Sequence, residues 1–410
     1  DPHDFQNAYT AQVISATYEN LYEYHYLKRP FTPVPALAAA MPVVSKDKKS
    51  MRISLKNGVR FQDDPCFEGG KGREFKAADV LYAYHRIASP KKLLNSYSGL
   101  AGIIAGIDDY HTGKAKTISG VRAIDDYTVE LSFTQPQPRF IYNLVDMHSA
   151  IVPKECVEKY GDQFASHPVG TGAYKIVEAN LGSKIVAVRN SNYRNVVYPS
   201  DGMPGDAEKG LLADAGKALP FIDKIVFEVI NESQPRWLKF LAGELEISGI
   251  PKDNMSGALV DGKLAPDLAA RGIQHFRQVR SDVTVESFNM QDPIWGKSKD
   301  LRHAYALALD VDKIIEMQYS RQAIRAQSLI DPQTYGFDPT FKSKWAHRDI
   351  KQAKELLAKA GYPEGKGLPP IVAPMNSGAE ARQMHELMER QLREVGFTVK
   401  SESLTWPEFE

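Results

Sequence analysis

Residues 371–404 read IVAPMNSGAEARQMHELMERQLREVGFTVKSESL, and they are the clearest indication of the fold class. The pattern predicts a strand from Ile371 to Ala373, then a helix from Glu380 to Val395 that Gly396 ends. A second strand is predicted from Phe397 to Leu404. A strand, a helix and a strand in this order are typical of an α/β fold.

The residues before this segment show the same α/β pattern back to about Asn289. Leu301 to Ala308 is predicted to be a helix, and Asp310 and Asp349 are the predicted caps of two more helices. Upstream of Asn289 the pattern is richer in short strands, the last of them predicted from Val283 to Asn289. We therefore predict a domain boundary near Asn289.

The N-terminal part is predicted to contain a long helix and a hairpin. Apolar residues recur near helical spacing from Thr10 to Tyr26. Alternating apolar residues from Met51 to Phe61, interrupted by the turn signal Asn57-Gly58, predict a β-hairpin.

The middle of the chain alternates between predicted helices, strands and loops. The predicted helices are Lys76–Ala88 and Pro235–Ala242. The predicted strands are two within Val121–Phe133, a hairpin of Gly170–Ile176 with Lys184–Arg189, Ile225–Ile230 and Leu245–Ile250. Residues 195–220 are polar and rich in Pro and Gly, which is typical of a long surface loop.

Composition excludes several classes of protein. The chain has 410 residues with 51 basic and 51 acidic side chains, so its formal net charge is zero. A neutral chain gives no signal for binding nucleic acid or an anionic membrane. Hydrophobic residues make up 43% of the chain, which argues against disorder. The longest apolar stretch, Ala36 to Val44, is too short to cross a bilayer.

Catalytic and metal-binding motifs are absent from the sequence. Gly-x-Ser-x-Gly, His-Glu-x-x-His and Cys-x-x-Cys do not occur, and no two histidines lie four positions apart in a predicted helix. Gly69-Gly70-Lys71-Gly72-Arg73 is only superficially like a phosphate loop, because Gly72 stands where Ser or Thr would bind magnesium. We predict no catalytic residue, no metal site and no cofactor.

Cys66 and Cys156 leave two alternatives open. They could form one disulfide in an oxidising compartment, but the sequence alone does not establish the bond. Two unpaired cysteines are the simpler interpretation, and we adopt it.

Both ends suggest a piece of a longer protein. The chain starts at Asp1 without Met or a signal peptide, and it stops at Glu410 just after a predicted strand. We therefore draw nothing about the compartment from the missing signal.

Short segments in a fixed order give the chain a resemblance to a known family. They are Asp1-Pro2-His3, Tyr18–Leu21, Pro35–Ala38, Lys56–Phe61, Ala77–Val80, Val169–Tyr174, Leu219–Ile225, Leu241–Leu245, Phe288-Asn289, Leu301–Ala304 and Leu356–Pro363. Through them the chain resembles, over essentially all 410 residues, the extracytoplasmic solute-binding proteins of peptide-type ABC importers. These are the oligopeptide- and dipeptide-binding proteins of family 5.

The resemblance implies a two-lobed periplasmic-binding-protein fold of α/β class, type II, with an extra subdomain. Residues 1–33 and 151–280 would form lobe I, residues 34–150 a subdomain on it, and residues 281–410 an incomplete lobe II. The predicted strand from Val283 to Asn289 would cross between the lobes.

The resemblance also implies a function. The protein would capture an oligopeptide or dipeptide between the lobes and deliver it to the permease subunits of an ABC transporter. It would act as a monomer, periplasmic or anchored on the outer side of the membrane, without catalysis. Backbone pairing with the ligand would let it accept many peptides.

The ligand-binding residues implied by the resemblance are Gln6, Asn7, Ala8, Tyr9, Tyr97, Ser287, Phe288, Asn289 and Trp406. Each has a structural alternative. Residues 6–9 could simply precede a helix capped by Thr10, Tyr97 could be a surface tyrosine, and Asn289 a turn residue. Trp406 could close a strand, with Pro407 opening a helix.

The sequence departs from the family in length. Residues 66–73 and 196–218 are longer than usual, and both are expected to be surface elaborations. The family also continues past this C-terminus, where it carries an acidic residue that pairs with the amine of the peptide.

Other functions stay open. The same fold could bind nickel, haem or an oligosaccharide, although only four tryptophans mildly disfavour a sugar. A hydrolase would need a nucleophile beside a base, and no such constellation is found.

Overall fold

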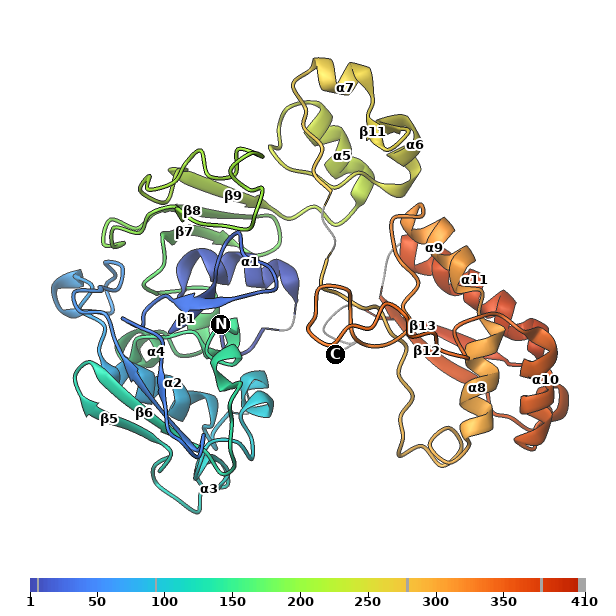
Figure 1. Cartoon of the computed structure of the whole chain (residues 1–410), viewed down its shortest axis with the longest axis horizontal. Coiled ribbons are helices and arrows are strands. Elements are labelled where there is room, and N and C mark those ends of the chain that lie inside the picture. Colours follow the sequence, from blue (N-terminus) through green and yellow to red (C-terminus); the bar gives the residue numbers. More distant parts are fainter. Residues whose placement is uncertain (6, 93, 278–279, 377–378, 405–410) are drawn as a thin grey trace. The chain divides into compact units, whose positions relative to one another are not determined.

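The structure is a computed structural model that describes residues 1–404 except 6, 93, 278–279 and 377–378 (Figure 1). It divides into two compact units, Asp1–Val229 and Ile230–Glu410, called unit 1 and unit 2 below, and each is described by itself. Compactness does not test which residues form a lobe, so the predicted lobe and subdomain boundaries stay predictions.

Antiparallel sheets form the framework of unit 1. The strands are β1 (Tyr22–Tyr24), β2 (Pro33–Pro35), β3 (Val43–Val44), β4 (Ser50–Ser54), β5 (Val121–Asp125), β6 (Thr128–Ser132), β7 (Tyr174–Asn180), β8 (Lys184–Arg189) and β9 (Lys224–Glu228). They pair in the orders β1-β2, β3-β4-β6-β5 and β7-β8-β9. The two strands predicted within Val121–Phe133 are confirmed as β5 and β6, and the predicted hairpin is confirmed as β7 and β8.

Helices and short 3-10 turns connect these strands. The α-helices of unit 1 are α1 (Ala8–Thr17), α2 (Ala77–Ile87), α3 (Ile107–His111) and α4 (Lys154–Tyr160). The 3-10 helices are η1 (Glu68–Gly70), η2 (Asn95–Gly99), η3 (Phe140–Tyr142), η4 (Met147–Ser149) and η5 (Gly161–Ala165). The predicted helix from Lys76 to Ala88 is therefore confirmed as α2.

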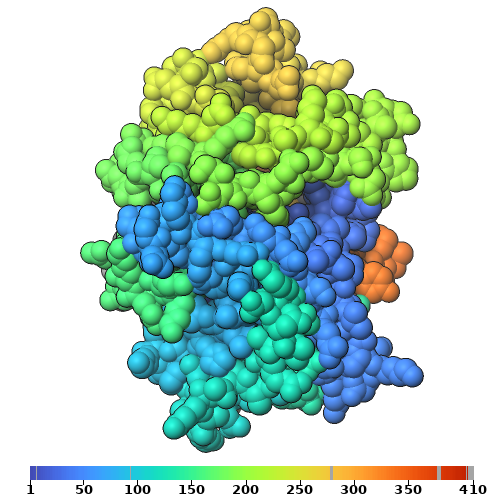
Figure 2. Space-filling view, turned by 90° about the vertical axis from the view of Figure 1, so that its left-hand side faces the viewer, coloured from blue at the N-terminus to red at the C-terminus, as the bar shows by residue number. Residues whose placement is uncertain are grey.

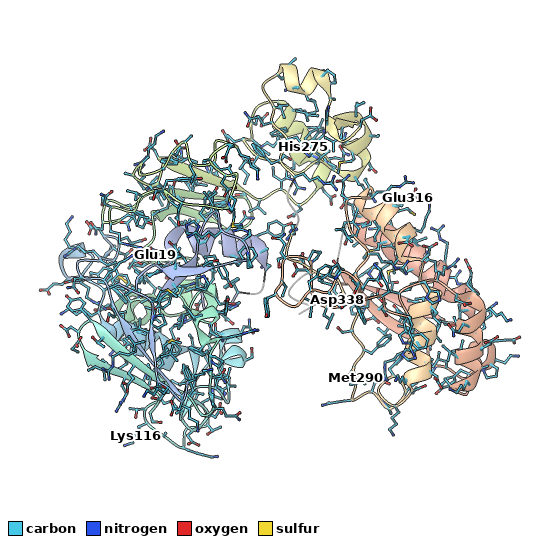
Figure 3. All side chains as sticks on the ribbon, in the orientation of Figure 1. Glu19, Lys116, His275, Met290, Glu316 and Asp338 are labelled. Atoms are coloured by element: carbon cyan, nitrogen blue, oxygen red, sulfur yellow. A yellow bond between two sulfur atoms is a disulfide. The ribbon has the colours of Figure 1, made fainter. Side chains whose placement is uncertain are left out.

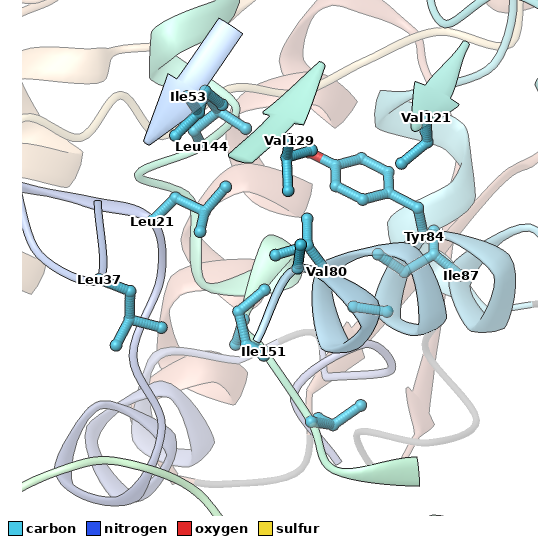
Figure 4. Close-up of a cluster of buried hydrophobic side chains, with 14 of the residues drawn as sticks. Leu21, Leu37, Ile53, Val80, Tyr84, Ile87, Val121, Val129, Leu144 and Ile151 are labelled. Atoms are coloured by element: carbon cyan, nitrogen blue, oxygen red, sulfur yellow. The ribbon is translucent and has the colours of Figure 1, made fainter. Parts of the chain in front are cut away.

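The core of unit 1 lies between α2 and the four-stranded sheet (Figure 4). Val80, Tyr84 and Ile87 form one face of α2, because residues three and four apart share a helix face. They pack with Val121 and Val129 of β5 and β6 in a single buried cluster. The short turns on which the site described below is built belong to the same unit.

The first helix is shorter than predicted. α1 ends at Thr17 because Tyr18 is extended (φ −109°, ψ 158°) and its hydroxyl accepts a hydrogen bond from the Val169 N–H. Asn20 then donates to the Val145 carbonyl. Tertiary partners thus override the helical spacing of Leu21 and Tyr24.

The predicted hairpin around Asn57-Gly58 is wrong. β4 pairs with β6 and β3, not with the residues that follow the turn. Val59 and Phe61 are nonetheless buried in the same core as Met51 and Ile53. The alternation reported burial correctly, but it carries no information about which strand is the partner.

Two further predicted strands are wrong. Residues 245–250 form no strand, and Ile247 is 87% exposed. Residues 283–289 form no strand either, since they pair with no neighbouring strand in the part of the chain that the structure describes. A β-strand needs a hydrogen-bonded partner, which an apolar run does not supply by itself.

The two cysteines are paired, contrary to the interpretation adopted from the sequence. A disulfide joins Cys66 to Cys156 of α4. It links residues 90 positions apart whose Cα atoms lie 4.9 Å from each other.

The polar segment 195–220 is an irregular surface loop, as predicted (Figure 2). Its ends meet at a bridge between Val197 and Ala218, and Tyr198 donates to the Leu211 carbonyl. In unit 1 Figure 3 shows Glu19 inside, where it pairs with Arg194, whereas Lys116 lies at the outer edge.

Unit 2 contains the predicted strand–helix–strand. Its strands are β10 (Leu259–Val260), β11 (Lys263–Leu264), β12 (Ile371–Asn376) and β13 (Val399–Leu404). Its helices are α5 (Ser233–Leu241), α6 (Met255–Ala258), α7 (Pro266–Ala270), α8 (Lys299–Ala308), α9 (Val311–Tyr319), α10 (Ile350–Lys359) and α11 (Ala379–Val395), with η6 (Lys252–Asn254) and η7 (Pro363–Gly365).

Local signals in unit 2 were predicted well. β12 and β13 pair in parallel through the crossover helix α11, from Ile371↔Val399 to Asn376↔Leu404. Asp310 and Asp349 cap α9 and α10 by accepting from backbone N–H groups three residues on. A buried cluster formed mainly by α8, α10 and α11 gives this region its own core.

Candidate functional site

A cavity of about 530 Å³ opens on unit 1 where three chain segments meet. Its lining residues are Phe5, Asn7 and Ala8 at the N-terminus; Asn95, Ser96, Ser98, Gly99 and Leu100 around η2; and Asn143, Asp146, His148 and Ser149 around η4. We call this cavity the cleft.

The start of α1 forms the first wall of the cleft. Asn7 is the N-cap, and its Oδ1 accepts from the Thr10 N–H at 2.9 Å. Ala8 is the first helical residue, so its backbone N–H has no intrahelical partner. Asn7, not the predicted Thr10, caps the helix because only Asn7 has the extended backbone of a cap.

The turn η2 forms the second wall. Ser96 donates from its hydroxyl to the His3 carbonyl at 2.6 Å, which ties η2 to the N-terminal segment. Ser98 donates to the Asn95 carbonyl at 2.9 Å and stays exposed at the cleft. Short hydroxyl side chains that bond the local backbone keep this wall polar and compact.

The region around η4 forms the third wall. Ser149 donates to the Asn143 carbonyl at 2.7 Å, and Asn143 donates to the Gly99 carbonyl at 3.2 Å. The Asn143 contact joins this wall to η2. The cleft is therefore held in shape by hydrogen bonds among its own walls.

Asp146 and His148 are the acidic and basic residues among those that line the cleft. His148 Nδ1 lies 2.7 Å from Asp146 Oδ1, and its Nε2 lies 3.0 Å from the Phe5 carbonyl oxygen. The hydrogen bond that His148 donates to Asp146 raises the pKa of His148 and lowers the pKa of Asp146. When His148 is protonated the two charges cancel, so the cleft is then polar without net charge.

The predicted N-terminal site residues differ in whether they line the cleft. Asn7 and Ala8 line the cleft, while Tyr9 is 78% exposed on α1 and does not. Gln6 lies outside the described residues.

Tyr97 belongs to η2 but points elsewhere. Its hydroxyl donates to Asp108 Oδ1 at 2.7 Å, and its ring stacks on His111 with centroids 3.8 Å apart. Burial, followed by the bond to Asp108, raises the pKa of Tyr97 to about 12. Its hydroxyl is thus directed to α3, whereas its neighbours Ser96 and Ser98 line the cleft.

The remaining predicted residues belong to unit 2. Phe288 stacks on Trp295 with centroids 5.0 Å apart and meets Tyr305 edge-on. Asn289 Oδ1 accepts from the Gln291 N–H at 3.0 Å, which is the turn role weighed as its alternative. Ser287 is exposed, and Trp406 lies outside the described residues.

Phe5, Ser98, Asn143, Asp146 and His148 line the cleft but were not predicted. His148 bonds to Phe5 across 143 positions of sequence, so no local pattern could have revealed the contact.

One acidic and sulfur-containing cluster stands out in the described residues. Ligand atoms of Asp64, Cys66 and Cys156 lie within 4.8 Å of one another. Both sulfurs take part in the disulfide, so neither is available as a thiolate for a metal ion.

Comparison with known families identifies the chain. Residues 32–410 match the family described as bacterial extracellular solute-binding proteins, family 5, middle region. The chain belongs to this family. The α/β, two-lobed periplasmic-binding-protein fold predicted from the motif order is confirmed.

Individual relatives agree with this assignment. The family 5 protein described here is 26% identical over 387 residues to the dipeptide-binding protein of Escherichia coli K12, covering 92% of this chain and 64% of the relative. It therefore spans a little under two thirds of that relative. A periplasmic oligopeptide-binding protein from Borrelia burgdorferi has a TM-score of 0.75 at 21% identity, covering 99% of this chain and 73% of that one.

A second similar structure holds a different kind of molecule. MoaA from A. tumefaciens R10, solved with mannopinic acid, has a TM-score of 0.70 at 21% identity over all of this chain and 71% of its own. At this level of identity both structures show the fold alone. Among the described residues of the family 5 protein, no helix is long and apolar enough to cross a membrane.

Proposed function

We propose that this protein is the extracytoplasmic substrate-binding component of an ABC importer and that it captures peptides. Membership of family 5 and the similarity to a dipeptide-binding protein support the proposal. The single observation that carries it is the cleft at the N-terminus of α1, with its polar walls and a volume of about 530 Å³.

The chemistry of the cleft fits a peptide backbone. A peptide presents alternating N–H and C=O groups whatever its side chains are. The Ala8 N–H, which has no intrahelical partner, can donate to a ligand carbonyl, and the oxygens of Ser98 and Asn143 can accept from ligand N–H groups. Water can fill the remaining space, so side chains of several sizes fit.

The second half of the binding site is proposed on lobe II. Ser287, Phe288, Asn289 and Trp406 would contact the ligand from residues 281–410, while Gln6, Asn7, Ala8, Tyr9 and Tyr97 would do so from the N-terminal part. Phe288 stacked on Trp295 offers an aromatic surface of the kind that packs on ligand side chains.

The proposed role involves binding and delivery, not catalysis. The partners would be the peptide and the permease subunits of the transporter, and the protein would work as a monomer outside the cytoplasm. No cofactor or metal is part of the proposal. A non-peptide solute is the second candidate, and the similarity to a structure holding mannopinic acid favours keeping it.

The test is to fill the cleft. Ser98 is exposed and lines the cleft, so Ser98→Trp inserts a bulky ring without disturbing the core. Ser166 is equally exposed, at the end of η5, and Ser166→Trp is the matched control. We expect Ser98→Trp to weaken dipeptide and tripeptide binding at least about tenfold in calorimetry, because a filled pocket excludes its ligand.

Two results would contradict the proposal. One is equal peptide affinity of both tryptophan variants and the wild type, which would show that the peptide does not bind in the cleft on which the proposal rests. The other is mass spectrometry of the co-purified ligand that finds only non-peptide solutes, which would favour the second candidate.

A further inference from the structure

His148 is held on both of its ring nitrogens. Nδ1 faces a carboxylate oxygen of Asp146 at 2.7 Å, and Nε2 faces the carbonyl oxygen of Phe5 at 3.0 Å. Both partners are acceptors, and only the imidazolium form has a donor on each nitrogen. The ring also stacks on Phe5, with centroids 4.2 Å apart and an interplanar angle of 7°.

These contacts restrain the first wall of the cleft, which is the start of α1. Phe5 comes two positions before Asn7, which caps α1 and lines the cleft together with Ala8. A hydrogen bond and a ring stack on Phe5 therefore restrain where the helix N-terminus lies. Asp146 in turn is fixed, because its Oδ1 also accepts from the His148 N–H at 2.9 Å.

We propose that His148 is a positioning residue for the ligand wall: its imidazolium clamps Phe5 to Asp146 and so fixes the start of α1 for the ligand. The expected effect on ligand binding rests on the proposed function. The contacts of His148 with Phe5 and Asp146 can be tested without a ligand. Loss of the proton removes one of the two donors. The wall then loosens, and affinity falls.

The other charged and titratable groups near His148 are either neutral or paired with other residues. On its own turn the partner is Asp146. On the N-terminal segment, His3 stays neutral because burial and then Arg86 lower its pKa to about 3. Asp1 pairs with Arg86, and Asp4 lies 3.7 Å from Lys92, so neither carboxylate is left without a counter-charge.

The sign of the pH dependence follows from Asp146. Its hydrogen bond raises the pKa of His148 above the ordinary value of 6.5. The clamp is therefore complete below the ordinary value and is lost as the pH rises through the raised one.

The first experiment needs no ligand and compares amide hydrogen exchange in the wild type, His148→Gln and His347→Gln. Glutamine carries both of its N–H donors on one nitrogen, so it cannot replace the bonds that the two separate ring nitrogens make to Asp146 and Phe5. His347 is exposed in unit 2, which makes His347→Gln the matched control. The reporters are the Thr10 and Ala11 amides, which bond to Asn7.

At about pH 6 we expect these amides to exchange roughly fivefold faster in His148→Gln than in the other two proteins, since a hydrogen bond to a charged group is lost. The difference should shrink as the pH is raised toward about 8.5, because a rising pH removes the His148 proton from the wild type. Equal exchange in all three proteins at pH 6, or a difference that does not change with pH, would overturn the inference.

The second experiment measures binding of Ala-Ala and Ala-Ala-Ala by calorimetry at the same two pH values. Wild type and His347→Gln should lose roughly fivefold in affinity at the higher pH, and His148→Gln should be weak and unresponsive at both. A His148→Gln variant with the wild-type pH response contradicts the inference. If no protein binds these peptides, the proposed function is in doubt, while the exchange experiment still decides the clamp.

Discussion

Arg73 shows how one side chain can join two helices. Its guanidinium forms paired hydrogen bonds to Asp79 at the start of α2 and to Glu155 at the start of α4, over distances of 2.6–2.9 Å. The Asp79 side chain is only 3% exposed. A buried carboxylate of this kind is tolerated because the Arg73 guanidinium and the Lys76 backbone N–H both donate to it.

We predict that Arg73→Met lowers the free energy of unfolding by about 2–3 kcal/mol, because Asp79 is left buried without its cation. Methionine keeps an unbranched side chain at this position but removes the guanidinium, whose carbon lies 5.3 Å from the ring centroid of Phe61 and 6.0 Å from that of Phe67. Urea unfolding followed by circular dichroism measures the change.

The matched control is Arg122→Met on β5. Arg122 is 60% exposed, and its partner Glu130 keeps Arg52 as a second cation. We expect a loss below about 1 kcal/mol, as for other exposed ion pairs. A loss as large as that of Arg73→Met would contradict the account of Asp79.

His3 predicts a loss of stability in acid. It is fully buried, its Nε2 donates to the Ala150 carbonyl at 2.8 Å, and its Nδ1 accepts from Arg86 at 2.7 Å. Burial and then Arg86 lower its pKa from 6.5 to about 3. The folded state thus disfavours the proton that the unfolded chain takes up, and stability present above pH 6.5 is lost as the pH falls toward 3.

The test compares wild type with His3→Gln, which keeps one donor and one acceptor but does not titrate. Between pH 7.5 and pH 5 the wild type should lose about 2 kcal/mol more unfolding free energy than the variant, from a slope of about 1.4 kcal/mol per pH unit. Equal losses in the two proteins would show that His3 does not titrate across folding.

At this scale the sequence revealed part of the cleft. Asn7 and Ala8 were predicted through the family resemblance, and both line the cleft. Asp146 and His148 were missed because their role depends on Phe5, which lies far away in sequence. Predicted contacts with the ligand remain predictions for every residue named.

At the scale of elements, helices with local signals were predicted and strand partners were not. The two ends of α10 were predicted from Asp349 and Gly361, because a cap and a terminating glycine act within one helical turn. β4 was paired with the wrong neighbour because its true partner, β6, lies 78 positions away at the Arg52–Glu130 contact. Periodicity gives the buried face of a strand, whereas pairing depends on contacts distant in sequence.

The disulfide is the element-scale feature that we expect to matter most for stability. It fastens α4 to the residues before η1 across 90 positions of sequence. Replacing both cysteines by Ser should lower the unfolding free energy by about 2–5 kcal/mol, because closing a long loop restricts the unfolded chain.

Urea unfolding of the wild type with and without a phosphine reductant provides the internal control. The reduced wild type should match Cys66→Ser/Cys156→Ser. Unchanged stability of both would mean that the bond adds nothing to the folded state.

At the scale of the whole molecule, the order of motifs predicted the family and the fold class, although single elements were wrong. The family match covers residues 32–410, so errors such as the hairpin at Asn57-Gly58 did not affect it. Lobe boundaries are harder to predict, because they depend on which residues move together. The change from a strand-rich to an α/β sequence pattern near Asn289 lies inside unit 2, which begins at Ile230.

Each unit has a core made only of its own residues. In unit 1 the main cluster runs from Ile14 to Val169, and in unit 2 the largest runs from Leu301 to Phe397. Ile53 and Leu357 are both completely buried, one in each cluster. We predict that Ile53→Ala destabilises unit 1 and Leu357→Ala destabilises unit 2, each by about 2–5 kcal/mol through the cavity it leaves.

Hydrogen exchange in increasing urea, read by mass spectrometry on peptides from residues 1–229 and from 230–404, separates the two units. Each variant should speed exchange mainly in peptides of its own unit and serves as the control for the other. Because cooperative exchange follows the residues that unfold together, exchange that rises equally in both units for either variant would mean that the cores unfold as one. In that case the division at Val229 would not be a boundary of stability.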